Sequence, residues 1–257
     1  MAIVHWVRFR HGGETCFGTL SGERVAPYGG DMFGTPQASG EVLRLAEVEL
    51  LTPTQPTKIV GLWNNYRALA TRLDLAIPAE PLYFLKAPSS LLAPGETIRR
   101  PAGYAGKVVF EGELGVVIGR SCSNVSVEQA PDCIFGFTCV NDVTAVDIIG
   151  KDPAFAQWDR AKGFDTFGPI GPVIATGLNP LELVVQTLLN DEERQHYPVS
   201  DIVFTPARLV AAISATMTLH PGDVIACGTS VGAGSMKPGS RIDIRIDGIG
   251  TLSNVFE

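Results

Sequence analysis

The amino-acid sequence predicts a mixed α+β fold in which β-strands dominate. Most apolar runs are short and rich in Val, Ile and Phe, residues that favour strands. Glycine, proline and asparagine separate these runs, and only a few segments show the apolar spacing of a helix. The 257 residues, 45% of them hydrophobic, are enough for two domains, or for one domain with a small appendage.

The N-terminal part predicts a small β-rich domain. Residues 2–27 contain three short apolar runs separated by the turns His11–Gly13 and Ser21–Gly22, which fits a meander of strands. A glycine-rich segment follows at Gly29–Gly40, and the stretch Thr52–Pro56 has the proline content of a linker. We therefore expect one domain over residues 1–56 and a second over residues 57–257.

The second domain is predicted to combine short strands with a few short helices. The expected strands are Ile59–Trp63, Leu82–Lys86, Val108–Gly119, Ile134–Val140, Leu181–Asn190, Val224–Cys227, Ser240–Asp247 and Gly250–Phe256. The expected helices are Tyr66–Leu75, Ser126–Ala130, Pro153–Ala161 and Pro206–Met217. The last is the clearest, because Thr205 is a suitable N-cap, Pro206 suits the first turn and apolar residues share one face.

Two carboxylates interrupt the apolar strand predicted at Val108–Gly119. Glu111 and Glu113 are two residues apart, so on a strand their side chains share a face, with Cα atoms roughly 6.5 Å apart. Two unpaired carboxylates on a buried face would repel, and a divalent cation between them would remove that penalty. Oxygen ligands favour Mg²⁺, Mn²⁺ or Ca²⁺ over zinc. The same alternation also fits a half-exposed strand with both glutamates in water.

A third carboxylate stands where the next apolar run ends. The run from Cys133 to Val140 stops at the pair Asn141-Asp142. If Asp142 lies beside Glu111 and Glu113, the three carboxylates form an oxygen site with room for water and substrate. Further along the chain, the glycine-rich loop Gly228–Gly234 could bring backbone N–H groups to a carboxylate. That loop lacks the glycine patterns of nucleotide-binding proteins, so we do not expect a nucleotide.

Composition excludes several other classes of function. The net charge is −7 and no basic run is present, which argues against nucleic acid as a partner. The sequence contains no apolar segment of membrane-spanning length and no leader pattern, so we expect a cytoplasmic protein without membrane contact. The five cysteines form no C-x-x-C pair and predict reduced core residues, and the four scattered histidines argue against a zinc site or a serine triad.

The second domain resembles the fumarylacetoacetate hydrolase superfamily, and the N-terminal domain resembles the small β-domain of many bacterial members. The matching motifs follow the family's order over residues 58 to 257. They are Lys58–Gly61 with Asn65-Tyr66, Phe84–Ser90, Glu111-x-Glu113-Leu114-x-x-Val117-Ile118-Gly119, Asn141–Ala145, Lys162–Asp165, Pro221-Gly222-Asp223 and Gly228-Thr229.

The resemblance implies a fold, a cofactor and a set of site residues. The fold would be the family's mixed β-sandwich or β-roll, in a homodimer. Glu111, Glu113 and Asp142 would bind Mg²⁺ or Mn²⁺ (with Ca²⁺ as a further option), and Lys162 would be catalytic. Three more residues would bind the substrate, a small-molecule 2-oxo acid; they are Thr229, Lys86 and Tyr66. By itself, the position of Lys86 at a strand end indicates only a solvated charge.

Departures from the family pattern decide which reaction we expect. Hydrolytic members carry a histidine and a glutamate that activate water, and here Leu69 and Arg72 occupy those positions. Val146 replaces an arginine of the family's Asn-Asp motif. We therefore expect a catabolic decarboxylase or isomerase of a 2-oxo dicarboxylate that acts through a metal-stabilised enolate. The alternatives are C–C hydrolysis of an acylpyruvate and, from another class, a non-catalytic relative that binds a metal or ligand.

Overall fold

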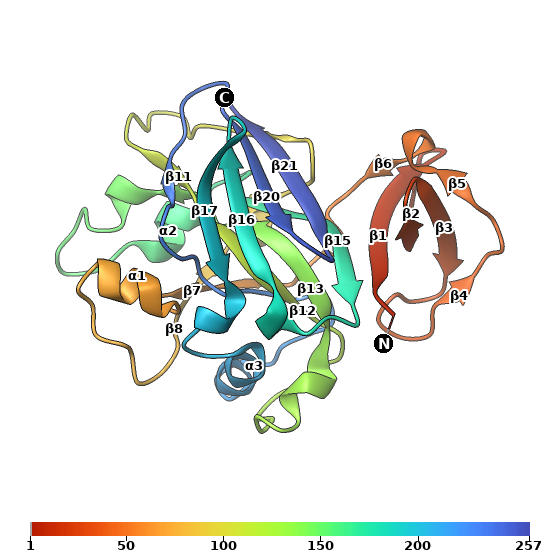
Figure 1. Cartoon of the computed structure of the whole chain (residues 1–257), viewed down its shortest axis with the longest axis horizontal. Helices are drawn as coiled ribbons and strands as arrows, with labels where there is room; N and C mark the ends of the chain where they lie inside the picture. Colours follow the sequence, from red (N-terminus) through yellow and green to blue (C-terminus); the bar gives the residue numbers. More distant parts are fainter. Residues whose placement is uncertain (1) are drawn as a thin grey trace.

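Strands dominate the computed structural model, which describes residues 2–257 (Figure 1). The described part of the chain contains three short α-helices, α1 (Arg67–Arg72), α2 (Trp158–Lys162) and α3 (Pro206–Ser214). The predicted β-dominated α+β class is therefore confirmed. Among residues 2–257, no helix is long and apolar enough to cross a membrane.

The largest sheet has 13 strands and runs through the whole molecule. Its main path, in spatial order, is β4 (Gln37–Ala38), β3 (Arg24–Gly29), β2 (Glu14–Ser21), β1 (Val4–His11), β15 (Gly168–Thr176), β13 (Ile134–Asn141), β12 (Gly112–Ile118), β18 (Val224–Ala226), β7 (Ile59–Trp63) and β8 (Leu82–Lys86). Three short strands attach to this path: β5 (Leu43–Arg44), β6 (Glu49–Leu50) and β9 (Leu91–Leu92).

Two smaller sheets complete the fold. One has five strands, in the order β10 (Thr97–Ile98), β21 (Gly250–Phe256), β20 (Arg241–Ile246), β16 (Val184–Leu189) and β17 (Glu192–Pro198). The other has three, in the order β14 (Thr144–Ala145), β11 (Val108–Phe110) and β19 (Gly234–Ser235). The five-stranded sheet lies over β12 and β13 in Figure 1, and contacts both of them.

Strand β12 is buried on both faces, which explains its nearly continuous apolar sequence. Leu114 and Val116 join the main core together with Ile244 of the five-stranded sheet. Val117, one residue further along, points the other way into a second cluster with Val140. A carboxylate on this strand has little access to water. Its desolvation cost therefore depends on which polar groups lie on the face to which it points.

The N-terminal strands form a separate lobe in Figure 1 but share the large sheet. Strand β1 pairs with β15 over Val4–Trp6 and Ile174–Thr176, and the predicted meander of β1, β2 and β3 is confirmed. This pairing joins the two predicted domains through main-chain hydrogen bonds. The domain division near residue 56 stays a prediction.

The helix predicted at Pro153–Ala161 is wrong over its first half. The Asp152 carboxylate accepts a hydrogen bond from the Ala154 N–H, which closes a local turn, and helix α2 begins only at Trp158. The segment Ser126–Ala130 is likewise a single turn and not a helix, closed by hydrogen bonds from the Gln129 and Ala130 N–H groups to the Ser126 main-chain oxygen. The clearest helix, at Pro206, is confirmed as α3.

The single strand predicted over Val108–Gly119 is also wrong, because the chain changes sheets at Glu111. β11 belongs to the three-stranded sheet and β12 to the large one, with Glu111 between them. The chain makes a second change of the same kind at Asp142, between β13 and β14. The two crossings are joined directly, since the Asp142 N–H donates to the Glu111 main-chain oxygen at 2.9 Å.

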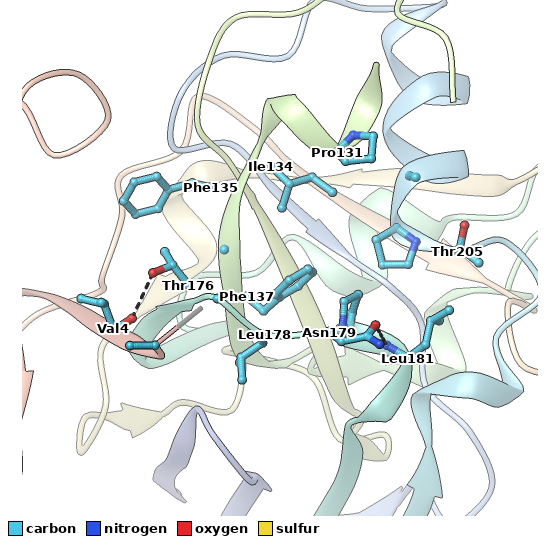
Figure 2. A pocket seen from close by; sticks show the side chains of 16 residues that line it. Val4, Pro131, Ile134, Phe135, Phe137, Thr176, Leu178, Asn179, Leu181 and Thr205 are labelled. Atoms are coloured by element: carbon cyan, nitrogen blue, oxygen red, sulfur yellow. Dashed lines mark hydrogen bonds between the residues drawn. The ribbon is translucent and has the colours of Figure 1, made fainter. Parts of the chain in front are cut away.

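An apolar pocket of about 920 Å³ lies between the start of β13, the end of β15 and the start of α3 (Figure 2). Ile134, Phe137 and Leu178 line it, and Asn179 uses its side chain on neighbouring groups of its own turn. None of the lining residues, all within the described chain, carries an ionisable side chain. This pocket therefore lacks the chemistry that a carboxylic acid substrate would require.

Candidate metal centre

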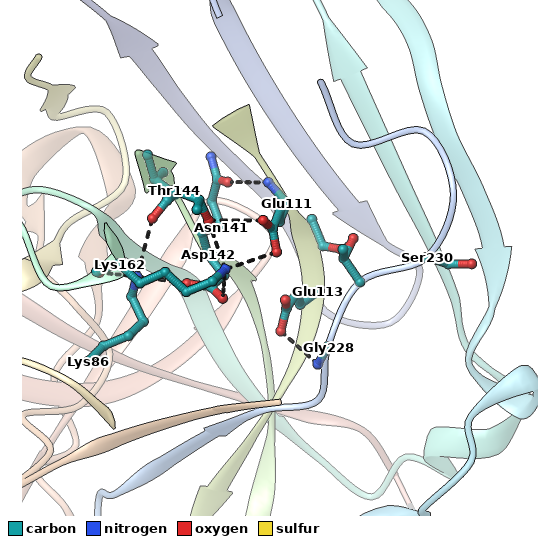
Figure 3. Close-up of polar contacts among 12 residues, drawn as sticks. Lys86, Glu111, Glu113, Asn141, Asp142, Thr144, Lys162, Gly228 and Ser230 are labelled. Carbon is teal, nitrogen blue, oxygen red and sulfur yellow. Dashed lines mark hydrogen bonds and ion pairs between the residues drawn. The ribbon is translucent and has the colours of Figure 1, made fainter. Parts of the chain in front are cut away.

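The two sheet crossings bring the three predicted carboxylates together (Figure 3). Glu111, Glu113 and Asp142 each present an oxygen within 4.8 Å of the others. Glu113 and Asp142 are fully buried, whereas the Glu111 side chain is 16% exposed and marks the open side of the cluster. Such a set of converging oxygens is what a hard divalent cation requires.

Lys162 contacts two of these carboxylates from the end of α2. Its Nζ lies 2.6 Å from Asp142 Oδ2 and 3.0 Å from Glu111 Oε2. It also donates to the Thr144 hydroxyl at 2.7 Å, and that hydroxyl donates in turn to Glu111 Oε1 at 2.9 Å. The lysine side chain is only 2% exposed, so it is not a solvated surface charge.

Lys86 is a second buried lysine in the cluster. The solvated strand end that its sequence position suggests is wrong, because the residue is 1% exposed at the end of β8. Its Nζ lies 2.7 Å from Asp142 Oδ1, and it also donates to the main-chain oxygens of Val143 and Lys162. All three protons of the ammonium group are therefore directed at protein atoms. Lys86 holds Asp142 and links it to the main chain of Lys162.

Burial and charge shift the pKa values of this cluster in opposite directions. Burial, with nearby Asp142, raises the pKa of Glu113 well above its ordinary value, and burial also raises the pKa of Glu111. Burial acts in the same direction on Asp142, but Lys162 and Lys86 outweigh it and lower the pKa of this carboxyl. Burial would lower the pKa of Lys162, but the surrounding carboxylates raise it. Asp142 is the member that stays ionised most readily.

Glu113 has the unsatisfied atom that tests whether a cation fits. Its Oε2 accepts a hydrogen bond from the Gly228 N–H at 2.8 Å, so the glycine-rich loop does bring an N–H group to a carboxylate. Its Oε1 is buried and has no hydrogen-bond partner among residues 2–257. The cluster also holds one more carboxylate than ammonium groups. A divalent cation would bind the bare oxygen and reverse the net charge, so the residues fit Mg²⁺ or Mn²⁺.

The other two residues assigned to the substrate occupy different environments. The Thr229 hydroxyl donates to the Gly112 oxygen at 3.0 Å and accepts from Gln195 Nε2 at 2.8 Å. Tyr66 is fully buried with its ring edge against Tyr197, and its hydroxyl has no partner in the described chain. Burial raises the pKa of Tyr66 well above its ordinary value, so this hydroxyl is a proton donor without an acceptor.

Helix α1 carries no group that could act as a base on water. Its six residues are Arg67-Ala68-Leu69-Ala70-Thr71-Arg72, without histidine or carboxylate. Leu69 packs against the main core and Arg72 is exposed. Val146, in place of the family's arginine, is a partly exposed apolar residue just after β14.

Three residues that shape the cluster were not among the predicted site residues. The Asn141 side chain accepts the Glu111 N–H at 3.0 Å, and its place at the end of a buried strand was a signal for such a role. Gln195 and Tyr197, on β17, bind the main chain of Gly112 between the two glutamates. No local signal marked them, because β17 reads as an exposed strand and lies about 80 residues away from Gly112.

Family models match nearly the whole chain. A model described as "Fumarylacetoacetate (FAA) hydrolase C-terminal" matches residues 58–257. The chain belongs to the fumarylacetoacetate hydrolase family. A second model, "Rv2993c-like, N-terminal", matches residues 4–53. Both matches confirm the resemblance found in the sequence.

Members of this family that are similar to the chain include named isomerases. Protein Rv2993c of Mycobacterium tuberculosis is 43% identical over 225 residues, which cover 86% of this chain and 83% of the relative. Oxaloacetate tautomerase YisK of Bacillus subtilis is 38% identical over 224 residues, or 82% of this chain and 73% of YisK. The crystal structure of 2-hydroxyhepta-2,4-diene-1,7-dioate isomerase from Mycobacterium marinum is 38% identical, with a TM-score of 0.90 over 98% of each chain.

Proposed function

We propose that the protein is a divalent-metal-dependent isomerase or decarboxylase of a 2-oxo dicarboxylate. The observation that carries this proposal is the buried cluster of Glu111, Glu113 and Asp142, in which Glu113 has one bare oxygen and Lys162 pairs with the other two carboxylates. Two similar proteins are named as a tautomerase and an isomerase, and both names describe proton shifts in 2-oxo or 2-hydroxy dienoic acids.

The three carboxylates would hold Mg²⁺ or Mn²⁺. When bound, the cation supplies positive charge that withdraws electrons from the 2-oxo group of a chelating acid. The chain's own contribution begins with the fixed geometry of the ligands. Lys86 holds one oxygen of Asp142 and Lys162 holds the other, so this carboxylate has no freedom to rotate.

Lys162 supplies a second positive charge at the site. The surrounding carboxylates raise its pKa, so the ammonium group is protonated in the metal-free protein, and a cation bound to those carboxylates would lower that pKa again. A fixed ammonium group beside a 2-oxo group stabilises the negative charge that develops on the oxygen when a proton or CO₂ leaves C3. Both reactions need this stabilisation, and neither needs a water nucleophile.

Helix α1 favours these reactions over hydrolysis. Attack by water benefits from a general base, which typically contributes about 10²–10⁴-fold. Leu69 and Arg72 occupy the positions where such a base would stand, and neither can accept a proton at neutral pH. We therefore predict a poor hydrolase that remains competent in tautomerisation or decarboxylation.

The test measures three reactions on one batch of enzyme in Mg²⁺: conversion of enol- to keto-oxaloacetate, CO₂ release from oxaloacetate, and acetate release from acetylpyruvate. The matched control is the Glu113→Gln protein at the same metal concentration, which corrects for catalysis by free metal. We expect tautomerisation or CO₂ release above the control, and acetate release at least 10²-fold lower in kcat/KM, the lower end of a general base's contribution.

Two results would contradict the proposal. Acetate release with a kcat/KM equal to or above that of the other reactions would make the protein an acylpyruvate hydrolase, with water activated by another group. Metal binding without turnover of either compound would instead favour a non-catalytic relative that binds a metal and a ligand.

A further inference from the structure

The main chain of Gly112, which links the two glutamates, is hydrogen-bonded by side chains that lie outside the large sheet. The Gly112 N–H donates to Gln195 Oε1 at 3.0 Å. The Gly112 carbonyl oxygen accepts from the Tyr197 hydroxyl at 2.6 Å and from the Thr229 hydroxyl at 3.0 Å. Both polar groups of the residue between Glu111 and Glu113 are therefore held by side chains that come from distant parts of the chain.

Gln195 and Tyr197 act from one face of β17. They are two residues apart on a strand, so they point the same way, and both are buried. The His196 side chain between them is exposed to solvent and pairs with Glu193 on its own strand. The buried face of β17 thus presents one acceptor and one donor that match the two polar groups of Gly112.

Gln195 also connects this link to the loop that holds Glu113. Its Nε2 donates to the Thr229 hydroxyl at 2.8 Å and to the Ser230 main-chain oxygen at 3.1 Å. The preceding residue of that loop, Gly228, donates its N–H to Glu113 Oε2. One glutamine therefore binds both the main chain next to Glu113 and the loop that binds its carboxylate.

Close packing leaves Gly112 no space on the side of the five-stranded sheet. A Cβ atom at this position would lie 2.0 Å from Thr187 Oγ1 and 3.2 Å from Gln195 Oε1. Only glycine fits, because any side chain would push the link away from β16 and β17. The five-stranded sheet therefore helps to fix the separation of Glu111 and Glu113, together with the sheets that carry these residues.

We propose that Gln195 and Tyr197 are positioning residues that set the spacing of Glu111 and Glu113 and thereby the affinity of the cluster for its cation. The inference rests on the proposed function, since it concerns the same metal site. Neither residue contacts the carboxylates, and both act through the Gly112 peptide. Groups that orient metal ligands typically contribute 10- to 100-fold to metal affinity or activity.

The experiment compares Mn²⁺ binding to metal-free wild type, Gln195→Met, Tyr197→Phe and His196→Ala, measured by the free-Mn²⁺ signal in electron paramagnetic resonance. Methionine keeps the length of the side chain without its hydrogen bonds, and phenylalanine removes a single oxygen. His196→Ala is the matched control, because His196 lies between the two on the same strand and faces solvent. Thermal unfolding of each metal-free protein is recorded in parallel.

We expect Kd for Mn²⁺ to rise about tenfold in both test variants and to stay at the wild-type value in His196→Ala. At saturating metal, kcat should recover to within a few-fold of wild type, since the chemistry itself does not use these side chains. A purely structural role would lower the melting temperature of the metal-free protein and leave Kd unchanged, and that result would overturn the inference.

The design separates failure of this inference from failure of the proposed function. If wild type binds no Mn²⁺, the proposed metal site is wrong, and so is the positioning role. If wild type binds and both folded variants bind equally well, only the positioning role is wrong. Should Gln195→Met fail to fold, Tyr197→Phe decides, because its ring still fills the same space.

Discussion

Two fully buried carboxylates in this protein, Asp223 and Glu113, have opposite surroundings. Asp223 accepts five hydrogen bonds from three residues on either side of the β7–β18 pairing. Glu113 accepts one, from Gly228, and its second oxygen is bare. Both are 0% exposed, so burial alone does not distinguish them.

The donors to Asp223 show how a carboxylate serves the fold. Its Oδ1 accepts from the N–H and hydroxyl of Thr57 and from the N–H of Lys58, at 2.7 to 3.1 Å. Its Oδ2 accepts from Lys58 Nζ and from the His220 N–H. Every lone pair is used within the chain, so Asp223 joins the segment before β7 to the turn before β18 and has nothing left for a ligand.

These two residues indicate that the number of hydrogen-bond donors, and not burial, separates a structural carboxylate from a functional one. A fully satisfied carboxylate stabilises the fold, and removing it leaves its donors unpaired. An incompletely satisfied carboxylate costs stability in the absence of a ligand, and is retained where a cation or substrate completes it.

The bare oxygen of Glu113 predicts that Glu113→Gln abolishes metal-dependent activity without harming the fold. Turnover should fall to the background measured without metal. The metal-free variant should melt at the same temperature as metal-free wild type or higher, because a neutral amide replaces a buried carboxylate that lacks a partner. Steady-state kinetics with Mg²⁺ and thermal unfolding in a chelator provide the two measurements.

The pH dependence of stability supplies a control for this variant. Burial raises the pKa of Glu113, so the folded state favours its protonated form. The resulting stabilisation of the metal-free wild type is full below the unfolded pKa and is lost as the pH rises through the folded pKa. Glu113→Gln should lack this part of the decline. Equal pH profiles in the two proteins would mean that the pKa of Glu113 is not raised by burial in the folded state.

Because Asp223 accepts hydrogen bonds at both oxygens, we expect the reverse pattern for Asp223→Asn, a loss of stability without a loss of metal binding. The free energy of unfolding should fall by about 3 kcal/mol, because an amide NH₂ group would replace the oxygen that accepts from Lys58 Nζ and the His220 N–H, and the buried charge pair with Lys58 would be lost. Metal affinity and kcat/KM of the folded protein should stay at wild-type values. Urea unfolding measures the first quantity and Mn²⁺ titration the second. A loss of metal affinity without a loss of stability would break the comparison.

Lys162 is a buried cation that pairs with two of the three carboxylates of the cluster, so it can serve both the fold and the reaction. Lys162→Met should lower kcat by about 10²-fold, a usual cost of losing an electrostatic group at a reacting oxygen. That factor corresponds to about 2.7 kcal/mol, the smallest of the three effects. Kinetics at saturating Mg²⁺ measure it, and near-normal turnover would assign Lys162 to the fold alone.

The carboxylate cluster was predictable from the sequence even though the predicted element was wrong. Glu111 and Glu113 do not share one continuous strand, since the chain changes sheets at Glu111. Residues two apart are nevertheless always close in space, whatever the backbone does. The prediction that Asp142 joins the two glutamates rested on its position at the end of a buried apolar run. In the structure Asp142 does lie at that end, between β13 and β14.

The partners of the cluster were not predictable, because nothing local marks them. Lys86 has the sequence position of an exposed strand end and is buried only because Asp142 and the end of α2 cover it. Gln195 stands among charged and polar residues on β17 and is buried only because Gly112 packs against that strand. Such roles depend on contacts between segments far apart in the chain, which strand patterns do not encode.

The crossing at Glu111 also limits how the length of this chain can vary. A residue inserted between Glu111 and Glu113 would separate the two carboxylates by up to about one more residue length, roughly 3.3–3.6 Å. It would also displace the Gly112 groups from Gln195 and Tyr197. Most of the glycine-rich segment Gly29–Gly40 has no such restriction, since Met32 is its one buried residue. Insertions and deletions should therefore accumulate in that segment, while the spacing of the two glutamates stays at two residues.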